Sequence, residues 1–148
     1  LGKIKRKIPT IMNYQKHIEA GSLMNTPPVF AVYVSMLTLQ WIEAEGGLVE
    51  MGRRAKERAN LLYSTIDRLP FYKTTVAKED RSEMNAVFFI EDENVQNLFL
   101  EECKKAGFIG VKGYRTVGGI RVSMYNALPL SSVQAMTDLM QSFAQQHG

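Results

Sequence analysis

The sequence has 148 residues, of which 45% are hydrophobic and 22% are charged. These are ordinary values for a globular domain, and they exclude a chain that is disordered throughout. The formal net charge is only +3, and the spread of basic and aromatic residues over one face that is typical of nucleic-acid binders is absent. We therefore expect one domain and no nucleic-acid partner.

The first 47 residues predict two helices. Residues 1–12 look extended, because Pro9 is unsuited to a helix interior and isoleucine alternates with lysine. Residues 13–20 form a short predicted helix that Gly21 closes. Thr26 is the predicted N-cap of a long helix, with two prolines in its first turn.

From residue 48 onward the chain alternates helices and strands. The long segment 48–68 is a predicted helix whose outer face carries charged residues, among them Arg58. Valine and phenylalanine enrichment indicates a buried strand at 84–90. The later predicted elements are a helix at 94–106, strands at 108–112 and 119–125, and a helix from the N-cap Ser131 to about Gln145. This order predicts an α+β fold, a two-layer sandwich in which helices cover one face of a small, mostly antiparallel sheet.

The predicted strand 119–125 carries the first candidate site. Side chains alternate along a strand, so Arg121, Ser123 and Tyr125 share one face while Ile120, Val122 and Met124 pack inward. Arg115 lies across a glycine turn from Arg121. Two arginines so placed suit a ligand with two separate anionic groups. The spacing also fits a surface strand whose arginines pair with carboxylates of the same domain.

The second candidate site is Asn25-Thr26, before the long helix. A helix N-terminus attracts phosphate through free N–H groups and a partial positive charge, although simple helix capping explains the same residues. His17 and His147 lack the spacing of a metal site, so we predict no metal. The single cysteine, Cys103, excludes an internal disulfide and suits a reducing compartment. No apolar stretch is long enough to span a bilayer, so we expect a cytoplasmic protein without a membrane partner.

Four ordered motifs resemble the phosphoserine aminotransferase family. They are SLMNTPP at 22–28, WIEAEGG at 41–47, DRSEMN at 80–85, and KGYRTVGGIRVSMYN at 112–126. The resemblance implies the type I aminotransferase fold, a homodimer and the cofactor pyridoxal 5'-phosphate. It implies amino-group exchange between phosphoserine plus 2-oxoglutarate and 3-phosphohydroxypyruvate plus glutamate in serine biosynthesis. It also implies the 4-phosphohydroxythreonine step of pyridoxine biosynthesis.

The resemblance assigns roles to five residues. Arg121 would bind the substrate α-carboxylate, and Arg115 the substrate phosphate or the distal carboxylate of glutamate. Asn25 and Thr26 would bind the cofactor phosphate in the site of the neighbouring subunit. Tyr114 replaces the histidine usual in the family, and its hydroxyl can donate a hydrogen bond to phosphate but supplies no titrating positive charge.

The resemblance also implies that residues 1–148 are a C-terminal small domain, with 1–26 as the strand and connection that leave a large domain. The lysine that carries the cofactor covalently belongs to that large domain, so we expect no catalytic residue here and an inactive chain. The alternative is a free-standing α+β domain that senses a ligand or binds a protein. Exposed Met24, Val29 and Phe30 would favour the enzyme fragment, and their burial would favour the free-standing domain.

Overall fold

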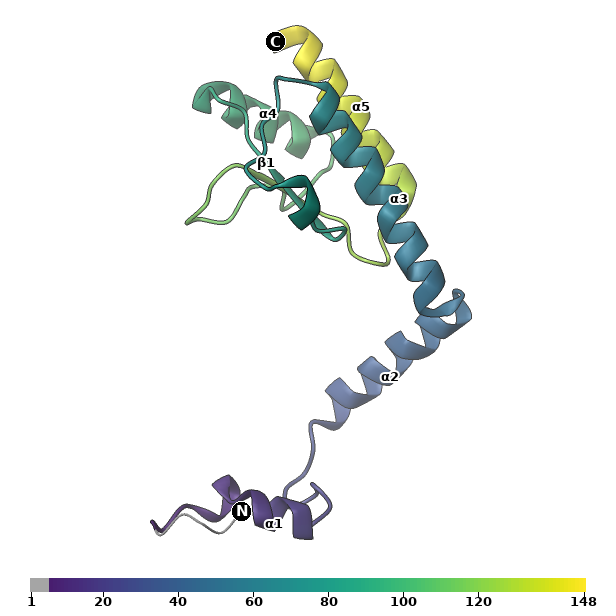
Figure 1. Ribbon diagram of the computed structural model, residues 1–148, viewed down its shortest axis with the longest axis vertical. Coiled ribbons are helices and arrows are strands. Elements are labelled where there is room, and N and C mark those ends of the chain that lie inside the picture. The colour runs from purple at the N-terminus through teal and green to yellow at the C-terminus, as the bar shows by residue number, and fades with distance from the viewer. Residues whose placement is uncertain (1–5) are drawn as a thin grey trace. The chain divides into compact units, whose positions relative to one another are not determined.

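The computed structural model describes residues 6–148, which form two compact units (Figure 1). The first unit ends at Ala44 and the second is Glu45–Gly148. Each unit is described by itself.

The end of the segment 1–12 that was predicted to be extended is instead a short turn. Thr10–Met12 is a 3₁₀ helix, because the Met12 N–H donates to the Pro9 carbonyl at 3.0 Å and closes a turn. Residues 1–5 of the predicted segment lie outside the described residues. The helix α1, Tyr14–Glu19, confirms the short helix predicted at 13–20. The Asn13 side chain caps its start by accepting a bond from the Gln15 N–H at 3.0 Å.

The long helix of this unit, α2, spans Val29–Ala44. Thr26 is not its N-cap, contrary to the prediction, because the first helical bond runs from the Val32 N–H to the Pro28 carbonyl at 3.1 Å. A residue that precedes proline is disfavoured from helical conformation, and both Thr26 and Pro27 precede a proline. None of the described helices, α2 included, is both long and apolar enough to cross a membrane.

The C-terminal unit contains the remaining elements. Their order is α3 (Gly47–Arg68), the 3₁₀ helix η2 (Lys78–Asp80), β1 (Asn85–Phe88), α4 (Glu93–Lys105), β2 (Ile120–Ser123) and α5 (Leu130–His147). Figure 1 shows α3 and α5 lying side by side. The helices at 48–68 and 94–106 are confirmed to within a residue or two of their ends.

Two secondary-structure predictions for this unit are wrong in detail. Residues 108–112 form no strand but only an isolated bridge between Lys112 and Ile120, because Gly107 and Gly110 have left-handed φ angles of 88° and 77° that interrupt extended backbone. The helix α5 starts after Pro129 without a side-chain cap, so Ser131 is not its N-cap.

The sheet packs one face into the core. β1 and β2 are antiparallel, with Ala86 opposite Val122 and Phe88 opposite Ile120, and all four side chains are buried. Aromatic side chains extend this core through edge-to-face contacts. They are Tyr72, Phe88, Phe99 and Phe143. The arrangement confirms the α+β fold.

Arg58 of α3 lies in the interior rather than on the predicted outer face. Its side chain is only 2% exposed, and its Nη1 donates to the Leu128 carbonyl at 3.1 Å. Burial lowers the pKa of the Arg58 guanidinium. The helical period identifies the charged side of α3 but cannot show that the turn before α5 covers part of it.

Candidate functional site

Arg121 projects from the face of β2 that is opposite the core. Its neighbours Ile120 and Val122 are buried on the inner face, as the alternation predicted, and Met124 is buried too. The Arg121 side chain is half-buried, and its Nε atom is shielded from solvent without a hydrogen-bond partner. A strand holds this guanidinium in a defined direction, with its stem covered and its outer nitrogens accessible.

Arg115 lies in a closed loop immediately before β2. The Gly113 N–H donates to the Gly119 carbonyl at 2.8 Å, and the Gly118 N–H donates to the Tyr114 carbonyl at 2.7 Å. Gly119 has φ +70°, and a Cβ there would lie 2.5 Å from the Phe89 ring. Only glycine fits this position, and it allows the loop to approach β1 closely. The exposed tip of the loop presents Tyr114 and Arg115.

Neither candidate arginine has an acidic partner within residues 6–148. Arg53, Arg54 and Arg81 each pair with a carboxylate at 3.0 Å or less. No such ion pair involves Arg115 or Arg121 among the residues that the structure describes. The alternative that these two arginines pair with carboxylates of their own domain therefore finds no support in residues 6–148, and both guanidinium groups can accept an anionic ligand.

The motif at 80–85 fixes the start of β1 beside Arg121. Arg81 forms a two-pronged ion pair with Asp67 of α3 at 2.8 and 2.9 Å and lies over the Tyr63 ring. The Tyr63 hydroxyl donates to the Ser82 and Asn85 carbonyls at 3.1 and 3.3 Å. These contacts anchor the strand that pairs with β2.

Asn85 is a further polar residue on the Arg121 face of the sheet that the sequence interpretation did not single out. It faces Ser123 across the sheet, and the Ser123 Oγ donates to the Asn85 Oδ1 at 2.9 Å. The signal was available, because Asn85 ends the DRSEMN motif and lies two residues before Val87, on the same face of the predicted strand.

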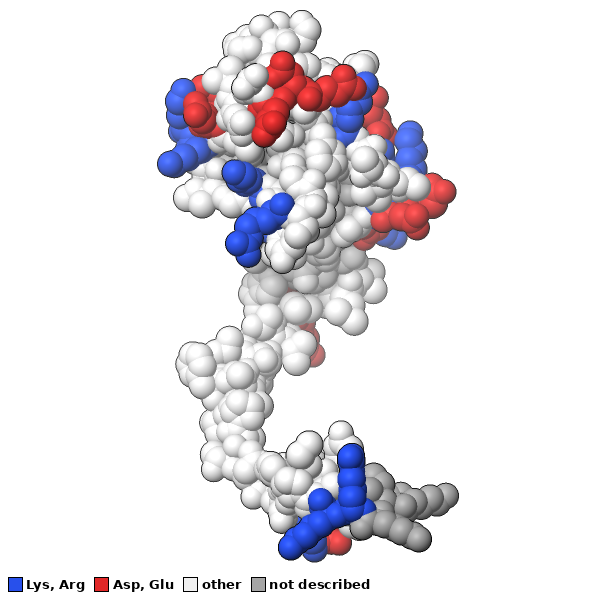
Figure 2. Space-filling view, turned by 90° about the vertical axis from the view of Figure 1, so that its left-hand side faces the viewer, with Lys and Arg blue, Asp and Glu red and all other residues white. Residues whose placement is uncertain are grey.

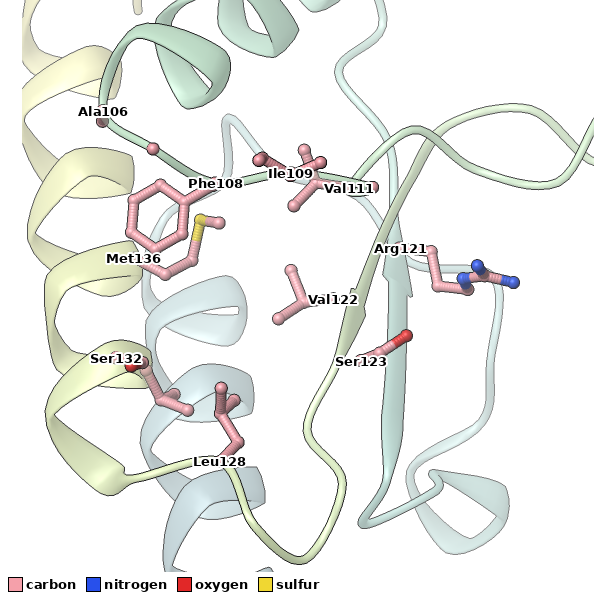
Figure 3. A pocket seen from close by; sticks show the side chains of 13 residues that line it. Ala106, Phe108, Ile109, Val111, Arg121, Val122, Ser123, Leu128, Ser132 and Met136 are labelled. Carbon is pink, nitrogen blue, oxygen red and sulfur yellow. The ribbon is translucent and has the colours of Figure 1, made fainter.

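An apolar pocket of about 320 Å³ lies beside the other side of β2 (Figure 3). Phe108, Val122 and Met136 line it, whereas the side chains of Arg121 and Ser123 point away from it. Arg121 and Ser123 border the pocket, but their side-chain polar groups point away from it, and its mainly apolar lining suits an apolar occupant.

Asn25 and Thr26 belong to the N-terminal unit, so the structure does not relate them to the arginines of the C-terminal unit. Both side chains are exposed. The Asn25 Nδ2 donates to the Thr26 carbonyl at 3.1 Å, which leaves one amide hydrogen free. The Thr26 hydroxyl has no hydrogen-bond partner among the described residues. These donors are chemically suited to a phosphate group.

The described lysines are unsuited to covalent chemistry. All of them are exposed, namely Lys7, Lys16, Lys56, Lys73, Lys78, Lys104, Lys105 and Lys112. A lysine that attacks a carbonyl group at neutral pH needs a desolvated setting that lowers its pKa. The pKa values of Lys16 and Lys105 are instead raised, mainly by hydrogen bonds to Glu19 and Glu102. No group of acidic, histidine or cysteine side chains within the described part could hold a metal.

Comparison with known proteins places these features in a family. A model of the aminotransferase class-V family matches residues 2–136. The phosphoserine aminotransferase of Phocaeicola vulgatus is 49% identical over 150 residues, which cover 99% of this chain and 42% of that protein. The phosphoserine aminotransferase of Flavobacterium psychrophilum is 50% identical over 140 residues, which cover 95% of this chain and 39% of that protein.

Solved structures of the same kind are similar in fold. Phosphoserine aminotransferase from Bacillus circulans subsp. alkalophilus has a TM-score of 0.88 and 37% identity, covering 95% of this chain and 39% of that one. The phosphoserine aminotransferase from Trichomonas vaginalis, solved with pyridoxal phosphate bound, has a TM-score of 0.82 and 34% identity over 93% of this chain and 40% of that one. The chain thus spans about two fifths of the length of its relatives. Because the family model matches most of its length, the chain belongs to the class-V aminotransferases.

Proposed function

We propose that the chain is part of a pyridoxal-phosphate-dependent phosphoserine aminotransferase. The enzyme transfers an amino group between glutamate and 3-phosphohydroxypyruvate in serine biosynthesis, and 4-phosphohydroxythreonine in pyridoxine biosynthesis is a second substrate. The observation that carries the proposal is the half-buried guanidinium of Arg121 on a rigid strand, without an acidic partner among residues 6–148, with Arg115 on the adjoining loop. Relatives named phosphoserine aminotransferase supply the reaction class.

Each arginine has a distinct role. Arg121 binds the substrate α-carboxylate, because a half-buried, strand-held guanidinium offers paired donors at a fixed angle. Arg115 binds the phosphate of phosphoserine, or the distal carboxylate of glutamate, from a loop that can adjust to either group. Tyr114 adds one neutral hydrogen bond to the phosphate. Binding at both ends orients the amino group between them.

Asn25 and Thr26 hold the phosphate of the cofactor, which their free hydroxyl and amide hydrogens fit. In the homodimer that we propose, they do so in the site of the neighbouring subunit. The cofactor supplies the electron sink of the reaction when it is bound. In the proposed enzyme the lysine that anchors it belongs to the large domain, which agrees with the exposure of every lysine within residues 6–148. Residues 1–148 therefore contribute substrate and cofactor binding, and the chain alone is inactive.

The alternative function is a free-standing domain that senses a ligand or binds a protein. Val29 and Phe30 of α2 are 63% and 81% exposed, and Met24 is half-buried. The helix carries one charged residue, Glu43, and its surface in Figure 2 is almost without charge. Apolar surface of this extent is typical of a segment covered by another domain or subunit. It favours the aminotransferase fragment.

The test uses a full-length enzyme in which residues 1–148 replace the matching segment of the Phocaeicola vulgatus relative. We expect this chimera to transaminate phosphoserine. Arg121→Ala removes a charged, two-pronged contact worth about 3 kcal/mol or more, so kcat/KM falls about 100-fold or more. Arg53→Ala, which changes an exposed arginine of α3, is the matched control.

Arg115→Ala tests whether Arg115 binds the phosphate end of the substrate. It should reduce kcat/KM for phosphoserine far more than for serine, which lacks the phosphate. Equal losses for the two amino acids would contradict the role of Arg115, and an unchanged kcat/KM in Arg121→Ala would remove Arg121 from the site.

A further inference from the structure

A second polar group shares the sheet face of Arg121, the side-chain amide of Asn85. Asn85 lies opposite Ser123 in the register, and Val87 lies opposite Arg121. Because Ala86 is buried on the inner face, its neighbours Asn85 and Val87 project from the outer one. The amide and the guanidinium are therefore diagonal neighbours on one surface.

The Ser123 hydroxyl determines which way the amide points. Its Oγ donates to the Asn85 Oδ1 at 2.9 Å, which turns the Nδ2 group away from Ser123. Within residues 6–148, the Asn85 Nδ2 has no acceptor. The buried polar atoms that lack a partner do not include this Nδ2 atom, so solvent and a ligand can reach it. The two N–H groups of the Asn85 amide thus face outward beside Arg121.

The backbone of Asn85 is held on both sides. Its N–H donates to the Ser82 Oγ at 3.2 Å, and its carbonyl accepts from the Tyr63 hydroxyl. Tyr63 in turn lies under the Arg81 guanidinium, at 4.8 Å from ring centre to Cζ. A donor fixed in this way loses little conformational entropy when it binds a ligand.

We propose that Asn85 is a further substrate-binding residue, whose amide donates to the same carboxylate that Arg121 binds. The inference rests on the proposed function. Diagonal neighbours in an antiparallel pair lie about 7–8 Å apart, and a carboxylate that accepts bonds of about 2.9 Å from each side bridges two such side chains. Arg121 supplies the charge, and Asn85 supplies a directed neutral donor to the second oxygen. Asn85 therefore selects amino acids over amines that lack the α-carboxylate.

The test compares two ligands of the full-length chimera, O-phosphoserine and O-phosphoethanolamine, which differ by the α-carboxylate. Asn85→Ala should weaken phosphoserine binding about tenfold or more, as expected for a lost hydrogen bond to a charged group, and should leave phosphoethanolamine binding within about twofold. Ser123→Ala keeps the amide but frees its rotation, so the same selective loss should appear at smaller size. Asn60→Ala, at an exposed position of α3, is the matched control and should change neither affinity.

The outcomes separate this inference from the proposed function. A chimera that transaminates and responds to Arg121→Ala, but binds phosphoserine unchanged in Asn85→Ala, overturns the role of Asn85 alone. Equal weakening of both ligands in Asn85→Ala and Ser123→Ala does the same, because it indicates a general structural effect. An inactive unmodified chimera, or one indifferent to Arg121→Ala, counts against the proposed function instead.

Discussion

Gly119 determines how closely the Arg115 loop approaches the sheet, and Gly119→Ala tests this. An alanine there must adopt φ near +70°, which costs about 1–2 kcal/mol for a residue with a Cβ. The new Cβ would also lie 2.5 Å from the Phe89 ring and 2.8 Å from the Phe88 carbonyl. Relief of such overpacking costs about 1–3 kcal/mol more. We expect a total loss of about 2–5 kcal/mol in the free energy of unfolding.

Gly118→Ala is the matched control, because Gly118 has φ +76° and a Cβ added there would meet no atom within 4 Å. It should lose only the conformational part, about 1–2 kcal/mol. The assay is urea unfolding of the chain, followed by circular dichroism. With a slope of about 1–2 kcal/mol/M, an extra loss of about 1 kcal/mol lowers the midpoint by about 0.5–1 M relative to the control. Equal midpoints for the two variants would refute the steric argument.

Three further predictions concern other parts of the chain. The Arg81 guanidinium hydrogen-bonds Asp67 and lowers the pKa of that carboxyl to about 2. The contribution of this ion pair to stability is therefore present above about pH 4 and is lost as the pH falls towards 2. Asp67→Asn should lower the urea midpoint at pH 7 but not at pH 2, and the same difference at both pH values would exclude the ion pair as its cause. Burial raises the pKa of the Cys103 thiol to about 12, so a thiol reagent should modify it only after unfolding, and rapid labelling of the folded chain would contradict its burial. The exposed apolar side chains of α2 should make the chain self-associate, and Phe30→Glu should reduce this in sedimentation experiments; a monomeric unmodified chain would show that this surface needs no cover.

Local patterns predicted much of the fold and of the candidate site. The helices at 48–68 and 94–106 follow from apolar periodicity, which depends only on the geometry of the helix itself. The outward direction of Arg121 follows in the same way from alternation along one strand, with Ile120 and Val122 buried as expected. Backbone rules also explain the wrong start of α2, since the two prolines that suggested Thr26 as the cap disfavour a helix there.

Long-range packing decided the rest. Arg58 looks solvent-exposed from its helix, yet the turn at Leu128, 70 residues later, covers it and accepts its hydrogen bond. Asn85 joins the Arg121 face only because β1 pairs with β2 in a register that places it opposite Ser123. The sequence alone determined which residues each helix and strand could present, because those directions are set by local backbone geometry. Which of them meet, and which lose contact with water, depended on contacts between distant segments that no local pattern encodes.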